Sequence, residues 1–527
     1  MHRRADAQHG SAPADDKRHG AGAPGAASSL QEQGLHVFLL LLALRILNAL
    51  TTRTFFQPDE YFQSLEPAWQ MAFGEQGAAW ITWEWKNQLR SSLHPALFAG
   101  LFAGVSAISG ICSVPLALRA ELLIAAPKIT QAALAASTDY FTWRLAERAF
   151  GVWSSAAWAS VCCGVLTLSV LADRLYYGLW TFPPLRFIHF NIAKSLAVFY
   201  GTNRADYYLT EGLPLLLTTA LPFAAHSIWK VLWKDARSGP VPSYLALTCV
   251  TMTGALSLIS HKEVRFIYPL LPMLHVLAAQ PVASFLRPLT SRKKVAVAGF
   301  IATNLFIAGY ASQVHQRGVI DVIHMLRHQH ESQALQNSVA QSQESRKTTV
   351  GFLMPCHSTP WRSHLVYPEI KAWALTCEPP IDVPLDQRAS YLDEADEFYL
   401  DPGPVAWLDQ HMESVGTIRD RWNVSKAKAE SKPSGAESWR PWPAYLVFFQ
   451  QLEDTLSKFL QGTRYRECWR GFNSHFHDDW RRKGDVVVWC LDEDGPSGAH
   501  GRVEQTGSHG HKRLSSGQWA MERLRNM

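Results

Sequence analysis

The chain has 527 residues, which is too long for one ordinary soluble domain, so more than one compact unit is expected. Only 18% of the residues are charged and 20 are tryptophan, a composition poorer in charge than that of an average soluble protein. The formal net charge of +5 is not gathered with aromatic residues into a dense basic face, which argues against a nucleic-acid-binding protein.

The N-terminal segment is rich in Ala, Gly, His and charge and has few aliphatic side chains. Such a composition cannot bury enough apolar surface to fold. We therefore predict a disordered cytosolic tail over residues 1–34, placed on that side by Arg3, Arg4, Lys17 and Arg18. No cleavable signal pattern is visible, so the first apolar run is expected to remain as an anchor.

A series of apolar runs predicts a multi-span helical membrane domain over residues 35–312. Each run has roughly the length that a helix needs to cross a bilayer, and their continuity excludes a strand barrel. Arg45 and Asn48 interrupt the first run and are expected to face the protein interior or a wet cavity, unless Arg45 snorkels to the surface. The runs lie at about 35–56, 93–114, 118–138, 152–171, 212–232, 243–260, 266–286 and 294–312.

The basic loop around Lys293 lies between the last two runs and is predicted to be cytosolic. Counting outward from it places the loop around His261, and everything after about residue 313, in the lumen. Counting from the N-terminus places the loop 51–92 and Asp59 in the lumen as well. The two counts disagree near residue 160, where either one run is re-entrant or a segment is missing.

The stretch PDEYFQSLEPAW (58–69) follows the first run and carries two adjacent carboxylates, Asp59 and Glu60. Pro58 disfavours a helical conformation at Gln57, so the apolar segment is expected to end here. Asp59 could cap a short interfacial helix, and it could equally serve as a positioned general base.

The stretch HKEVRFIYPLLP (261–272) opens a later span and packs four ionisable residues, His261, Lys262, Glu263 and Arg265, into five positions. These side chains could form a solvated helix end with an internal salt bridge. Alternatively, Lys262 and Arg265 hold an anionic headgroup while Glu263 or His261 orders the array. A carboxylate base and a phosphate-binding cluster on one face suit group transfer from a lipid-phosphate donor to a hydroxyl.

Residues 313–492 alternate short apolar strands with polar stretches, which predicts a mixed α/β lumenal domain. Residues 493–527 are predicted to be a disordered tail. The sequon at Asn423 predicts a lumenal glycoprotein. Cysteines in the apolar runs, such as Cys112 and Cys249, are predicted to be core residues, whereas a disulfide is possible among Cys356, Cys377, Cys468 and Cys490.

Two local clusters in this domain admit a chemical reading. Asp393, Glu394 and Asp396 could bind a cation, although a solvated acidic turn is favoured. Cys356, His357 and Ser358 suggest a nucleophile, but direct neighbours rarely form such a pair, so a structural role is favoured.

The two motifs, in a multi-span setting, resemble the dolichyl-phosphate-mannose-dependent mannosyltransferases of glycosyltransferase family 22, which have a GT-C fold. Within that family the likeness is greatest to members that add the third mannose, in α-1,2 linkage, to the glycosylphosphatidylinositol (GPI) precursor. It covers roughly residues 36–155 and 165–490. Four further segments support it: ITWEWKNQLRSS (81–92), VHQRGVIDV (314–322), LMPCHSTPW (353–361) and YLDEADEFYL (391–400).

The resemblance implies a multi-pass protein of the endoplasmic reticulum membrane that uses dolichyl-phosphate mannose as donor and a GPI precursor as acceptor, without a metal or other cofactor. It implies Asp59 as the catalytic carboxylate with Glu60 beside it. It places His261, Lys262, Glu263 and Arg265 near the donor phosphate. The chain departs from the family between Ser160 and Gly164, where further spans are missing, and this coincides with the conflict in topology.

Three other functions stay open at this point. A mannosyltransferase of lipid-linked N-glycan assembly would share the HKE motif. A glycolipid transporter would also carry charged residues at the ends of spans. A non-catalytic subunit of an assembly is compatible with the missing spans.

Overall fold

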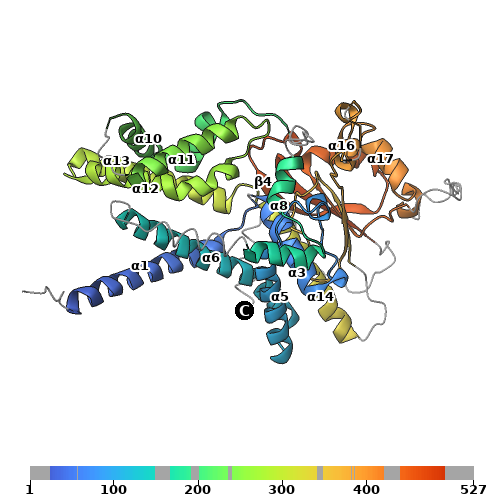
Figure 1. The fold of residues 1–527 in the computed structure, drawn as a ribbon. Coiled ribbons are helices and arrows are strands. Elements are labelled where there is room, and N and C mark those ends of the chain that lie inside the picture. Colours follow the sequence, from blue (N-terminus) through green and yellow to red (C-terminus); the bar gives the residue numbers. More distant parts are fainter. Residues whose placement is uncertain are drawn as a thin grey trace, which may run out of the picture.

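The computed structural model describes residues 24–55, 57–148, 167–190, 201–234, 240–340, 348–381, 383–384, 386–419 and 439–492. A group of long helices occupies one side of the molecule, and a twisted sheet with short helices around it occupies the other (Figure 1). Several sequence-based predictions fall outside the described residues: most of the tail 1–34, the tail 493–527, most of the run 152–171, and the sequon at Asn423.

The long helices follow the predicted apolar runs. Helix α1 packs along α6, and α12 packs against both α10 and α11; Figure 1 shows α10 to α13 as one layer and α1 with α6 as another. The membrane-part helices are α1 (Pro24–Thr51), α5 (Leu93–Ile111), α6 (Leu116–Arg148), α9 (Leu213–Leu217), α10 (Leu221–Trp229), α11 (Pro240–Ser257), α12 (Leu271–Leu286) and α13 (Ser291–Gln313). The next helix, α14 (Gly318–Ala340), packs against the C-terminal sheet.

Five helical segments of the described chain are long and apolar enough to cross a membrane by length and composition: Gln33–Thr51, Leu93–Ile111, Tyr208–Lys234, Val264–Leu286 and Ser291–Gln336. The prediction of a multi-span helical protein is therefore confirmed. The predicted runs 118–138 and 243–260 do form helices, α6 and α11, but they are not among these five.

The C-terminal part is built on a five-stranded mixed sheet with the order β2-β1-β3-β5-β4. Strand β1 is parallel to β2 and β3, whereas β5 is antiparallel to β3 and β4. The apolar runs predicted β1 (Thr349–Leu353), β3 (Tyr445–Phe449) and β5 (Gly484–Leu491). They did not predict β2 (Lys371–Ala374) or β4 (Tyr465–Ser474), which are the two edge strands and carry exposed charged residues.

The two faces of the sheet bury different partners. Alternate side chains of β3 point to opposite faces, so Val447 and Phe449 join the core with α14 and the first-loop helices, while Leu446 and Phe448 join a second core. That second core contains residues of α16 (Glu394–Tyr399), α17 (Pro404–His411) and α18 (Glu453–Phe459). The first face therefore docks the sheet onto the membrane part.

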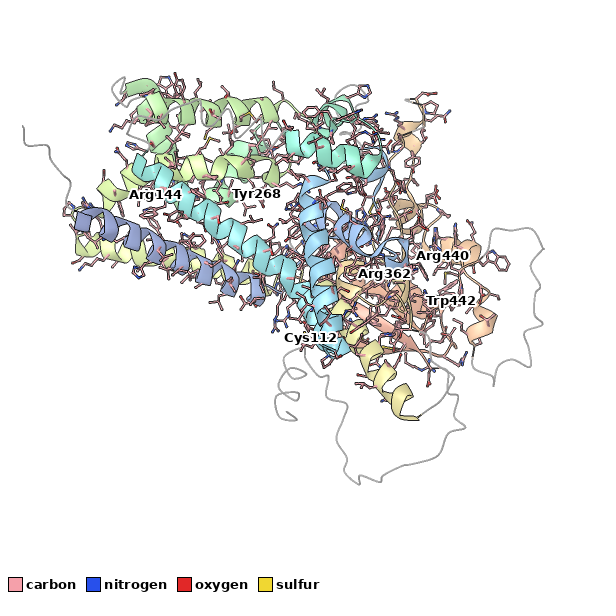
Figure 2. The ribbon with its side chains drawn as sticks, turned by 60° about the horizontal axis from the view of Figure 1, so that its bottom comes forward. Cys112, Arg144, Tyr268, Arg362, Arg440 and Trp442 are labelled. Carbon is pink, nitrogen blue, oxygen red and sulfur yellow. A yellow bond between two sulfur atoms is a disulfide. The ribbon has the colours of Figure 1, made fainter. Side chains whose placement is uncertain are left out.

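Two disulfides, Cys356–Cys377 and Cys468–Cys490, fasten the C-terminal part. The possibility raised by the sequence is confirmed for all four cysteines. Cys249 is buried as predicted, but Cys112 is exposed at the far end of α5, so the prediction of a core residue was wrong there (Figure 2).

Candidate active site

The first loop carries a helical segment made of α2 (Pro58–Glu60), η1 (Tyr61–Leu65) and α3 (Glu66–Phe73). Gln57 is extended, as Pro58 requires, and Pro58 takes the first helical position. The prediction that Asp59 caps this helix was wrong, because Gln57 occupies the cap and no side chain caps it. Asp59 is thus free of a capping role and projects from the first turn.

Asp59 lies against the second motif, although the two are some two hundred positions apart in the chain. Its Oδ2 contacts Nη1 of Arg265, and Nη2 of Arg265 lies 2.6 Å from Oε1 of Glu263. The same Glu263 oxygen lies 3.0 Å from Nε2 of His261. The guanidinium group therefore bridges two carboxylates, and the structure brings the acidic and basic motifs into one site.

Hydrogen bonding sets the charge of Glu263. Burial raises the pKa of this carboxyl, but the hydrogen bonds from His261 and Arg265 and the charge of Arg265 outweigh burial, so its pKa lies below the usual range. Glu263 is consequently an anion at neutral pH. It fixes the orientation of Arg265, because the guanidinium group is held from a second direction.

Lys262 does not join this array. Its side chain is buried, and its Nζ donates to the carbonyl oxygens of Ile259 at 2.7 Å and Asn203 at 3.2 Å. Its backbone N–H donates to Oδ1 of Asn203 at 2.7 Å. Lys262 thus ties the motif to the preceding loop, while Arg265 is the cation that faces Asp59.

Sequence reasoning did not single out Arg90 and Glu84 as site residues. Nη2 of Arg90 lies 3.8 Å from Oδ2 of Asp59 and 3.6 Å from Oε1 of Glu84. Gln63 donates to the same Glu84 oxygen at 2.9 Å. Arg90 and Glu84 both belong to the segment 81–92, which supported the family resemblance and could have marked them as site residues. The charge pattern of that segment alone did not show that Arg90 would lie beside Asp59.

Glu60 faces a different environment from its neighbour Asp59. It lines a cavity shared with Lys128 of α6 and Gln131. Although Glu60 is accessible from the cavity, burial by the surrounding protein raises the pKa of its carboxyl, and the charge of Lys128 opposes that effect. The two adjacent carboxylates therefore belong to two neighbouring sites.

The C-terminal domain holds the first loop in place through Glu66. This fully buried carboxylate accepts from the backbone N–H of Ser363 at 2.8 Å and of Trp80 at 3.1 Å. The neighbouring Arg362 donates to the carbonyl oxygen of Ala78 at 3.3 Å, and it lies where the loop meets the sheet domain (Figure 2). The rigid domain thereby positions the turn that carries Asp59.

Substitution of Glu66 tests this connection. Glu66→Ala leaves two buried N–H groups without an acceptor, so we expect it to lower the free energy of unfolding by about 3 kcal/mol. The midpoint of thermal unfolding of the purified protein measures this. Glu378→Ala is the control, because the Lys86–Glu378 pair also joins loop and domain at 3.1 Å but is exposed. Equal midpoints for the two variants would contradict the assigned role of Glu66.

The segment around His357 packs on the same loop. The His357 ring lies 4.1 Å from that of Phe62 and 5.0 Å from that of Trp80, between centroids. Burial lowers the pKa of His357 to about 3, so the ring is neutral. Cys356 is oxidised, and Ser358 donates to the Pro355 carbonyl oxygen. These contacts agree with the structural role favoured for this segment.

The acidic turn 393–396 is occupied by protein contacts. Asp393 caps α16 by accepting from the N–H of Asp396. Glu394 pairs with Arg440 at 2.7 Å, and Asp396 pairs with Arg481 at 3.0 Å. In the described part of the chain, one group has potential metal-ligand atoms close together, Cys356 with His357 and Cys377. Its two sulfur atoms are joined in a disulfide and so are not thiolate ligands.

The arrangement suits transfer from a phosphate leaving group. Asp59 is an oxygen acceptor for a proton, and Arg265 and Arg90 place positive charge beside it. Arg265 has five N–H donors, and its contacts with the two carboxylates leave further donors available for phosphate oxygens. A carboxylate and a cation cluster at one point can deprotonate a hydroxyl and neutralise a departing phosphate.

Comparison with known proteins supplies independent findings. The sequence model of the Alg9-like mannosyltransferase family matches residues 36–163 and 152–366. The two matches overlap at residues 152–163. This overlap includes the region near residue 160, where spans of the family were predicted to be missing. No solved structure gave a significant match.

Three relatives illustrate the similarity. GPI mannosyltransferase 3 of Emericella nidulans is 43% identical over 525 residues, covering 87% of this chain and 78% of the relative. That of Gibberella zeae is 35% identical over 597 residues, covering 85% and 94%. GPI alpha-1,2-mannosyltransferase 3 of Homo sapiens is 27% identical over 533 residues, covering 84% and 85%. The Gibberella alignment is longer than this chain of 527 residues, so that relative has segments without a counterpart here.

Proposed function

The chain belongs to the Alg9-like mannosyltransferase family, and we propose that it transfers the third mannose, in α-1,2 linkage, from dolichyl-phosphate mannose to the GPI precursor. Fungal relatives named GPI mannosyltransferase 3 and mammalian relatives named GPI alpha-1,2-mannosyltransferase 3 support the assignment. The observation that carries the mechanism is the contact between Asp59 and Arg265, which joins the two motifs in one site.

In the proposed reaction, the oxygen of the acceptor hydroxyl forms a bond to C1 of the mannose. The bond between C1 and the phosphate oxygen breaks, and its electron pair leaves with dolichyl phosphate. Asp59 takes the hydroxyl proton, and Arg265, held by Glu263, stabilises the charge that develops on the phosphate. If the donor is β-linked, attack from the opposite face yields the α-linkage.

Each remaining site residue has a supporting role in this scheme. Arg90 adds positive charge beside Asp59, and Glu84 holds Arg90. His261 orders Glu263, and Lys262 fixes the loop. Glu60 lines the adjoining cavity.

We place the protein in the endoplasmic reticulum membrane, with the tail 1–34 cytosolic, the domain 35–312 in the membrane, and the domain 313–492 in the lumen. The several spans and the names of the relatives support the membrane location. The two disulfides support an oxidising compartment for the C-terminal domain.

Expression in cells that lack their own third GPI mannosyltransferase tests the proposal. We expect this chain to convert the accumulated two-mannose GPI intermediate into the three-mannose form, as measured by mass spectrometry of the lipid-linked glycans. Cells lacking an N-glycan mannosyltransferase serve as the control and should keep their defect. Correction of the N-glycan defect instead would contradict the proposal.

A further inference from the structure

A cavity of about 270 Å³ lies beside the end of α1 and the middle of α6, next to Glu60 but not at the Asp59–Arg265 contact. Helices α1 and α6 run side by side toward this region (Figure 1). A smaller cavity shares Glu60, Tyr61, Lys128 and Gln131 with it. We call the two together the α1–α6 cavity.

The charges of this cavity are unevenly matched. Arg45, which lines it, is held by Asp139 through two hydrogen bonds of 2.6 and 2.8 Å, so that cation is neutralised and does not snorkel. Arg53 and Lys128 also line the cavity. Among the described residues, neither has a carboxylate oxygen within 4.0 Å or a side-chain hydrogen bond. Glu60 lines the cavity with these two cations. Glu121 and Asp321 also act on Lys128 and Arg53 through space, but these carboxylates are already paired with Arg327 and Arg317.

A buried polar atom also points to a ligand. His364 lines the smaller cavity, is only 4% exposed, and has no hydrogen-bond partner for its Nε2. Its Nδ1 contacts the Ser363 hydroxyl at 3.1 Å. Unsatisfied buried polar atoms are rare because they cost free energy. A bound group with a hydroxyl or an oxygen would satisfy this atom.

The depth of the cavity suits a lipid headgroup. Its lining residues Asn48, Thr52 and Arg53 lie at the last turn of α1 and just after it, where the first candidate span ends at Thr51. Cations at that level attract lipid phosphates. Amide and hydroxyl groups such as those of Asn48, Thr52 and Gln131 suit the hydroxyls of a polyol headgroup.

We propose that the α1–α6 cavity binds a lipid-borne phosphate group, with Arg53 and Lys128 as its ligands. The choice of which lipid supplies this phosphate rests on the proposed function. Because Arg265 is assigned to the donor phosphate, the phosphodiester of the GPI acceptor is the group left for this cavity. The neighbouring positions of Asp59 and Glu60 then place the two lipids on either side of one helical turn.

Kinetic measurements on Lys128→Gln and Arg53→Gln test the site. We expect KM for the GPI acceptor to rise about tenfold in each variant, with kcat within about twofold and KM for dolichyl-phosphate mannose unchanged. Lys128→Arg should restore KM, because it keeps the charge. Arg119→Gln is the control, since Arg119 lies on the same helix and donates to Ser106. A higher KM for the donor alone would support the phosphate site and assign it to the donor.

A binding measurement separates this inference from the proposed function. Short-chain phosphatidylinositol should raise the thermal unfolding midpoint of the purified wild-type protein more than short-chain phosphatidylcholine does, and Arg53→Gln should remove the difference. Arg53 is exposed, so this variant is expected to fold. Equal response to both lipids, with unchanged KM values in an active enzyme, would overturn the cavity proposal. An inactive wild-type protein that still binds phosphatidylinositol would count against the transferase function alone.

Discussion

Asp59→Asn is expected to reduce mannose transfer by about 10²- to 10⁴-fold, the range for removal of a general base. Asparagine keeps the size of the side chain but cannot accept the hydroxyl proton. It also loses the charge that pairs with Arg265. Transfer is measured in microsomes supplied with dolichyl-phosphate mannose, and kcat should fall far more than KM changes. Asp59→Ala should abolish transfer while the protein stays folded and inserted.

The matched control for Asp59 is Glu211→Gln. Glu211 lies in the short helical segment η5 (Tyr208–Gly212) and pairs with Arg204 at 3.2 Å. Both side chains are exposed, so the substitution removes an ion pair that makes no contact with the proposed site. Thermal unfolding midpoints of both variants should lie close to that of the wild type. Full-rate transfer by Asp59→Asn would remove this carboxylate from the mechanism.

The sequence carried enough information to predict the class of fold and the pairing of the two motifs. Apolar runs of span length and the buried strands β1, β3 and β5 identify themselves by hydrophobicity. The edge strands β2 and β4 do not, since their exposed positions carry polar residues such as Lys371 and Arg466. Edge strands take their conformation largely from pairing with a neighbour.

The internal division of the site was beyond sequence reasoning. Asp59 and Glu60 are adjacent, yet one meets Arg265 and the other lines the α1–α6 cavity. Lys262 and Arg265 were grouped as phosphate ligands, yet Lys262 binds backbone carbonyl groups. The direction of a side chain depends on the local helical geometry and on contacts with loops that are distant in the sequence. The order of charged residues along the chain contains no information about either.

The hydrogen bonds of the Glu66 carboxylate hold the first loop against the segment 361–363. A carboxylate beside an apolar segment would ordinarily be read as a surface residue, because buried carboxylates are rare unless paired. Here two backbone N–H groups from distant segments satisfy it. The sheet domain thus contributes to the proposed reaction indirectly, because it fixes the position of the helical segment that carries Asp59.

Arg265→Lys is expected to lower kcat by about 10²-fold, comparable to the loss of one donor to a developing oxyanion. Lysine keeps the positive charge but has no planar fork, so it cannot bridge Asp59 and Glu263 and still present donors to phosphate. Its flexible ammonium is also held less firmly, so KM for dolichyl-phosphate mannose should rise. Arg265→Gln, which removes the charge as well, should be more damaging than Arg265→Lys.

Arg317→Lys is the control that tests whether the planar, multiply donating guanidinium group matters specifically at Arg265. Arg317 pairs with Asp321 at 2.8 Å and is about as exposed as Arg265, but it lies just before α14 and not at the proposed site. Its replacement by lysine should leave kcat and both KM values within about twofold, because a partly exposed pair contributes little. If Arg265→Lys behaved like this control, positive charge alone would suffice at the donor phosphate. The bridge between Asp59 and Glu263 would then be a structural contact, and the cation that neutralises the leaving group would have to be sought at Arg90.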